Sequence, residues 1–183
     1  MKLFGVEPRP WSHRLRWLAL LTGAALVAVM LTNQYLATPE IPQHVMSYEL
    51  ADEPERAEQL HRQWQRNHTP LPELTLWVDF VFIGLYAVFL VALANHFLYD
   101  RPGIRERKAG RLAKVLLVLG ALGDAAENAF LITAIHQPET EVWPQLAAIA
   151  TLVKFTGLLV GGACLLVVRA ARRQPVQPED WRH

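Results

Sequence analysis

The sequence contains four apolar stretches, each long enough to cross a lipid bilayer, which takes about 20 residues in a helix. They cover roughly 15–36, 74–98, 112–135 and 144–168 of a 183-residue chain that is 52% hydrophobic. Water cannot solvate four such stretches, so each must be buried in lipid or in protein. We therefore expect an all-α membrane protein, an antiparallel bundle of four transmembrane helices that forms one membrane domain over residues 1–183.

The basic residues are distributed unevenly among the segments that connect the apolar stretches. Fourteen of the 18 Lys and Arg residues lie in 1–16, 99–114 and the tail 169–183, three lie in 37–73, and Lys154 lies deep inside the fourth stretch. Cytoplasmic segments of membrane proteins are enriched in Lys and Arg. We therefore expect a multi-pass protein with both termini in the cytoplasm and with the 37–73 loop on the outer side.

The outer loop is the longest hydrophilic segment, and its sequence DEPERAEQLHRQW predicts a short helix. Asp52 is followed three residues later by Glu55, which is typical of a helix start. Three apolar residues then recur at helical spacing and form one narrow stripe. A helix with such a stripe either lies on the membrane surface or caps the bundle, or else it binds a partner protein.

Three polar side chains interrupt the third stretch, in the sequence LGALGDAAENAF. Asp124, Glu127 and Asn128 are three and four residues apart, so they share one face of a helix. An unpaired charge in the middle of a bilayer costs on the order of 3 kcal/mol, so such a face does not point at lipid. We expect it to point into the bundle.

Other polar residues of the apolar stretches are candidates for the same site. A hairpin that turns near residue 139 brings Lys154 to the depth of Asp124 and Glu127, so we expect its ammonium to pair with one of them. In the second stretch, Asp79 and Tyr86 are seven residues apart and share one helix face. The candidate binding site of this polar centre therefore consists of Asp79, Tyr86, Asp124, Glu127, Asn128 and Lys154.

The formal charges of this centre do not balance, because three carboxylates face one ammonium. Two acids must then be protonated, hydrated from outside or neutralised by a bound group. The centre is either a structural ion pair that fixes helix register, or a site for a small ligand, lipid headgroup or cation, or a site of proton transfer. We expect a non-enzymatic accessory or small-ligand or lipid-binding protein. The alternative is a proton-coupled transporter element or a lipid-modifying enzyme that uses Asp124 and Glu127.

No pattern in the sequence indicates a metal, a cofactor or nucleic acid. The single cysteine, Cys164, excludes an internal disulfide and a CxxC site. Histidines in the predicted outer segments match no metal-ligand spacing; they are His44, His61, His68 and His136. The expected partners are membrane lipid and either further copies of the chain or a larger membrane complex.

The second and third stretches each carry a short motif, VDFVFIGLY ending at Tyr86 and GDAAEN ending at Asn128. These motifs resemble the D-F-x-F-x-x-x-Y and D-x-x-E-N patterns of a group of small bacterial four-helix membrane proteins that has no assigned activity. The resemblance covers about residues 45–135 and includes PERAEQL in the outer loop. It implies a bacterial inner-membrane protein in which the polar residues of both motifs act as a unit, and it implies no particular chemistry.

Overall fold

The computed structural model describes residues 10–35, 71–99, 103–137, 140 and 142–170. These residues form four helices: α1 (His13–Tyr35), α4 (Leu71–Leu98), α5 (Ile104–His136) and α6 (Val142–Ala170). Each helix is long and apolar enough to cross a membrane, so the prediction of an all-helical protein with four candidate spans is confirmed. The helix predicted in the outer loop lies outside the described residues, as does the tail beyond residue 170.

The helix α5 is longer than the apolar stretch from which it was predicted. It begins at Ile104 rather than near 112, because the polar segment IRERKAGR consists mostly of good helix formers. Gly103, in an extended conformation, precedes its first turn. At about 1.5 Å per residue, the 33 residues of α5 span about 50 Å. This exceeds the ~30 Å thickness of a bilayer's hydrocarbon core, so one end of α5 extends beyond it unless the helix is strongly tilted.

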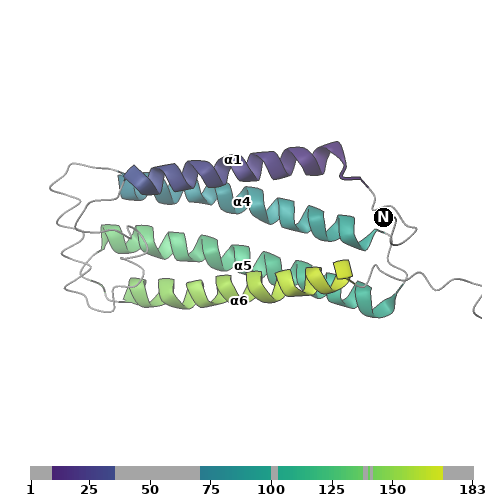
Figure 1. Ribbon diagram of the computed structural model, residues 1–183. Coiled ribbons are helices and arrows are strands. Elements are labelled where there is room, and N and C mark those ends of the chain that lie inside the picture. The colour runs from purple at the N-terminus through teal and green to yellow at the C-terminus, as the bar shows by residue number, and fades with distance from the viewer. Residues whose placement is uncertain (1–9, 36–70, 100–102, 138–139, 141, 171–183) are drawn as a thin grey trace, which may run out of the picture.

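The four helices lie side by side in chain order, and successive helices run antiparallel (Figure 1). The most extensive contact joins α5 and α6, while α4 packs against α5 and, over a smaller area, against α6. The first helix, α1, packs against α4 and makes at most marginal contact with α5 and α6. The described structure is therefore a three-helix core with α1 at its edge.

Glycines allow the backbones of α5 and α6 to approach closely. A Cβ atom at Gly157 would lie 2.6 Å from the carbonyl oxygen of Leu116 and 2.7 Å from the Cα of Gly120. A Cβ atom at Gly123 would lie 2.8 Å from the backbone nitrogen of Lys154. No larger side chain fits at these contacts, which resemble the small-residue packing common between membrane helices.

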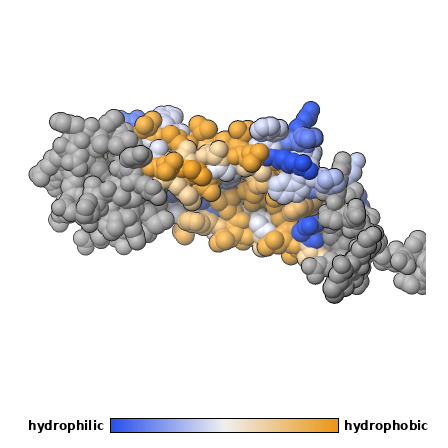
Figure 2. All heavy atoms as spheres, turned by 45° about the horizontal axis from the view of Figure 1, so that its top comes forward, coloured by the Kyte–Doolittle hydropathy of each residue, from blue (hydrophilic) through white to orange (hydrophobic). Residues whose placement is uncertain are grey.

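Apolar side chains fill the helix interfaces on both sides of the middle of the bundle. Toward the end where α4 begins, the buried cluster consists of Leu76, Leu131, Ala134 and Ala147. Toward the end where α4 finishes, the buried cluster consists of Ala94, Ala113, Leu117 and Leu165. The outer surface of the helices is also largely apolar (Figure 2), with Leu159 as much as 70% exposed, as expected of a surface that lipid covers.

Candidate functional site

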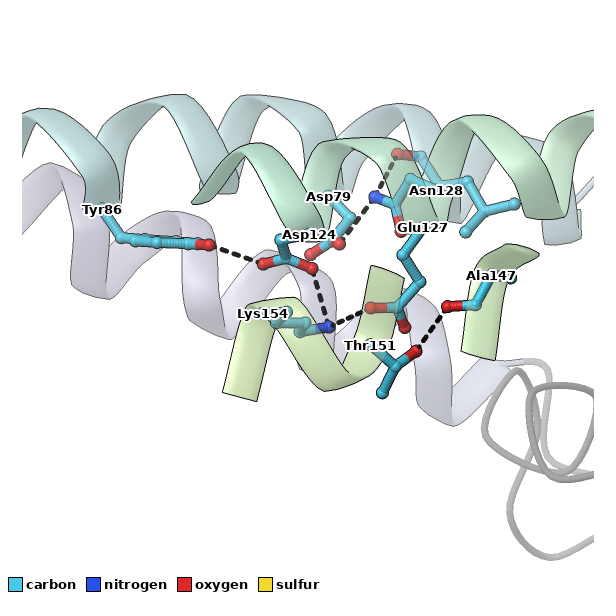
Figure 3. A network of polar contacts seen from close by, with 9 residues as sticks. Asp79, Tyr86, Asp124, Glu127, Asn128, Ala147, Thr151 and Lys154 are labelled. Atoms are coloured by element: carbon cyan, nitrogen blue, oxygen red, sulfur yellow. Dashed lines mark hydrogen bonds and ion pairs between the residues drawn. The ribbon is translucent and has the colours of Figure 1, made fainter. Parts of the chain in front are cut away.

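Six polar side chains meet between the two apolar clusters, and they are the six that the sequence predicts. They come from α4, α5 and α6, and hydrogen bonds and ion pairs connect them (Figure 3). We call this group the polar centre; it consists of Asp79, Tyr86, Asp124, Glu127, Asn128 and Lys154.

The ammonium of Lys154 lies between two carboxylates of α5. Its Nζ is 2.7 Å from Oδ1 of Asp124 and 3.1 Å from Oε2 of Glu127. In the predicted hairpin, Lys154 lies at the depth of both Asp124 and Glu127, so the sequence did not decide which of the two acids it pairs with. The structure brings it to both, because Asp124 and Glu127 follow one another on the face of α5 that contacts α6. Gly123 has no side chain, so it allows the backbone of α6 to approach α5 closely at Lys154.

Tyr86 connects α4 to the same group of charges. Its hydroxyl donates a hydrogen bond to Oδ2 of Asp124 at 2.7 Å. The two carboxylate oxygens of Asp124 thus have different partners, the Tyr86 hydroxyl on α4 and the Lys154 ammonium on α6. Tyr86 is held in place by packing with Ile83 and Ala121, which form a small buried cluster around it.

Asn128 and Asp79 form a second connection between α4 and α5. The side-chain amide of Asn128 donates to Oδ2 of Asp79 at 2.8 Å and lies 3.5 Å from the carbonyl oxygen of Leu76. The sequence analysis placed both residues in one candidate site but did not predict that they pair. The signal was present, because α4 runs antiparallel to α5. Asp79 precedes Tyr86 by two turns of α4, so once Tyr86 lies beside Asp124, Asp79 lies one to two turns farther along α5, toward Asn128.

Gly123 contributes to the geometry of the polar centre but was not among the residues predicted for it. It immediately precedes Asp124 and lies three residues after Gly120, and both glycines face the backbone of α6. The signal in the sequence was the spacing of these glycines within LGALGD. Without their close contact, the ammonium of Lys154 would lie farther from α5.

Burial differs sharply among the members of the polar centre. Asp124 is 4% exposed and Glu127 1% exposed, whereas the side chain of Lys154 is 22% exposed. Two buried carboxylates therefore share one ammonium, and Asp79 adds a third acid. Because an uncompensated buried charge is costly, this surplus of acids must be neutralised by protons or by a bound group or, for the partly exposed Asp79, hydrated.

The histidines do not form a metal site within the described residues, where no three His, Cys, Asp or Glu side chains are placed to hold an ion. His136 instead pairs with Glu73, with 3.5 Å between Nε2 and Oε1, at the end of the bundle where α4 begins. The other predicted outer histidines, His44, His61 and His68, lie outside the described residues.

Comparisons with protein-family models, with curated proteins and with solved structures find no match to this chain. Within the described residues, the chain has four helices long and apolar enough to cross a membrane, as in a multi-pass membrane protein, with charged residues buried between them. The geometry of the polar centre is therefore the guide to the function of this protein.

Proposed function

We propose that this protein is a non-enzymatic membrane protein that binds a small ligand or a lipid at the polar centre. The observation that supports the proposal is the sharing of one lysine by two buried acids. An ion pair that only fixed the register of α5 and α6 would require one acid for Lys154, and each further buried acid would add a cost. A ligand that donates hydrogen bonds would offset that cost, and Tyr86 and Asn128 would help to orient it.

We further propose that the protein spans the bacterial inner membrane with both termini in the cytoplasm. The basic side chains Arg105, Lys108 and Arg111 are exposed at the end of the bundle where α5 begins, and an excess of Lys and Arg favours the cytoplasmic side. The two sequence motifs support a bacterial origin. In this orientation, the 37–73 loop and its predicted helix lie on the outer side of that membrane.

A second candidate is a proton-coupled transporter element, and the surplus of acids favours it. If a proton rather than a ligand neutralises Asp124 or Glu127, the polar centre exchanges protons as its surroundings change. A lipid-modifying enzyme that uses the same two acids would need them to face a reacting group, and no contact of the polar centre supports this over binding.

Native mass spectrometry of the protein released from mild detergent tests the proposal. We expect the parent to retain a bound small molecule or lipid that the variant Asp124→Asn/Glu127→Gln/Lys154→Met loses. The matched control is Lys114→Met, because Lys114 donates to Asn95 at 3.1 Å outside the polar centre. A parent without any bound species under these conditions would contradict ligand binding. Proton uptake on acidification of that empty parent, absent from the triple variant, would instead favour the second candidate.

A further inference from the structure

Along the axis of the bundle, the polar centre is enclosed by apolar side chains at both ends. The buried members of the two clusters described above are no more than 5% exposed. At one end Leu76 and Leu131 pack together, and at the other Leu117 and Leu165 do so. A water-soluble molecule that approached along the axis would have to displace one of these packed clusters.

The side of the polar centre along α6 is less well covered. Thr151, Lys154, Leu158 and Gly162 recur every three or four residues and are all partly exposed. A Cβ atom at Gly162 would find nothing within 4 Å. The ammonium of Lys154 lies 5.6 Å from the ring centroid of Phe155, whose side chain is 51% exposed. The polar centre therefore borders the outer surface of α6.

The position of α1 leaves this side uncovered. A closed four-helix bundle would bring the first and last helices together, but α1 packs on α4 and makes at most marginal contact with α6. Figure 1 shows α1 and α6 on opposite sides of the α4–α5 pair. Within the described residues, α4 packs against Leu158, and α1 does not cover the rest of this strip of α6, which consists of Thr151, Lys154, Leu158 and Gly162 and stays partly exposed.

The depth of Lys154 decides what can reach this strip. Lys154 lies 12 residues after Val142 and 16 before Ala170, so it is about 18 Å and 24 Å from the two ends of α6. That position is near the middle of a hydrocarbon core about 30 Å thick. A charged phospholipid head stays in water, because moving it to this depth carries a large desolvation cost. A small uncharged head, such as a hydroxyl group, reaches it at much lower cost.

We propose that the polar centre is reached from within the bilayer, along the partly exposed strip of α6 that α1 does not cover, and that its ligand is a lipid with a small uncharged hydroxyl head. The hydroxyl donates its one hydrogen to a carboxylate and accepts from Lys154, while protons neutralise the surplus acids. The hydrocarbon chain lies along Leu158 and Gly162. The nature of the ligand depends on the proposed function, whereas the route depends only on the arrangement of the helices.

Spin labelling tests the route independently of any ligand. Replacing Cys164 by Ser removes the single cysteine, and Thr151→Cys or Gly162→Cys then carries a nitroxide. The reference is Leu159→Cys, at a position that is 70% exposed on α6. In vesicles, we expect the collision rate between oxygen and the nitroxide at both test positions to lie within about twofold of that at Leu159→Cys. We expect collisions with a water-soluble nickel chelate to be nearly absent. Greater accessibility to nickel than to oxygen would overturn the route.

Photocrosslinking in phosphatidylcholine vesicles tests the ligand. We expect a photoreactive diacylglycerol to label the parent at least fivefold more than an equally photoreactive phosphatidylcholine. Gly162→Phe should reduce this labelling to the phosphatidylcholine level, because it fills the strip. Gly84→Phe, at an exposed position of α4 that also has nothing within 4 Å, should leave it unchanged.

The two experiments separate failure of this inference from failure of the proposed function. A water-soluble molecule bound to the parent, together with nickel access at Thr151→Cys, would overturn the inference and leave ligand binding intact. Equal labelling by the two photoprobes, with no bound species in native mass spectra, would overturn both the lipid ligand and the proposed function.

Discussion

Lys154 has two acidic partners, and this makes its removal different from the loss of an ordinary ion pair. Both Asp124 and Glu127 are almost completely buried, and both lie within 3.1 Å of the ammonium. When one member of a buried pair is removed, the remaining charge is left uncompensated unless it takes up a proton. Here one substitution removes the ammonium that both acids share.

Lys154→Met should therefore lower the free energy of unfolding by about 3–5 kcal/mol. Adding Asp124→Asn should recover part of this loss, and adding Glu127→Gln as well should recover most of it, since neither acid that Lys154 contacted can then carry a charge. Unfolding in mixed dodecyl maltoside and SDS, followed by circular dichroism, measures the change. Lys114→Met is the control and should cost less than about 1 kcal/mol, because its bond to Asn95 is exposed. A Lys154→Met protein as stable as the parent would show that the ion pair is not structurally important.

Tyr86 supplies the hydrogen bond between α4 and the charged residues of α5, so Tyr86→Phe isolates a single contact. Loss of the 2.7 Å bond to Asp124 should lower the free energy of unfolding by about 1.5–3 kcal/mol, as is usual for a hydrogen bond to a charged group. The control is Thr151→Val, which removes a hydroxyl that bonds only to the carbonyl of Ala147 within α6. The same unfolding assay compares the two variants. An equal loss in both would mean that the Tyr86 bond contributes nothing specific.

At the scale of helices, the α5–α6 contact is stiff because backbone meets backbone there. A side chain can change rotamer to relieve a clash, but the carbonyl of Leu116 and the Cα of Gly120 cannot move without moving the whole helix. The geometry of the polar centre therefore depends on glycines that carry no polar group.

Gly157→Ala should push α6 away from α5 and reduce the free energy of unfolding by about 1–3 kcal/mol, the usual cost of overpacking. Gly162→Ala is the matched control on the same helix, and it should be neutral or slightly stabilising, since alanine favours helices and the added methyl group meets no atom within 4 Å. Thermal unfolding in detergent distinguishes the two. If Gly157→Ala were neutral as well, the close contact could not be maintaining the position of Lys154.

The sequence predicted some of these elements better than others, for physical reasons. A run of apolar residues is a local property, so the four spans were predictable, and counting residues from a turn was enough to place Lys154 beside Asp124. The start of α5 was missed, because helix propensity continues where hydropathy stops. The position of α1 at the edge was also missed. It depends on which apolar faces fit together, and apolar composition alone does not specify this.

At the scale of the whole molecule, the charge distribution should fix the orientation in the membrane. We expect green fluorescent protein fused to the C-terminus to fluoresce in bacterial cells, and alkaline phosphatase inserted in 37–73 to be active, because basic segments stay in the cytoplasm. Moving alkaline phosphatase to the C-terminus is the control and should give an inactive enzyme. Activity there would place the C-terminus outside and reverse the proposed orientation.

The ion pair between α5 and α6 also has a consequence for biosynthesis. When a helix enters the bilayer alone, a charged residue at its centre raises the free energy of insertion by about 2.5–3.5 kcal/mol. Asp124 and Glu127 impose this cost on α5, and Lys154 imposes it on α6. Only five residues separate His136 from Val142, so both helices can leave the insertion machinery as one hairpin whose charges already compensate each other. A ribosome stalled after α5 would thus hold a helix that is poorly able to enter lipid until α6 has been made.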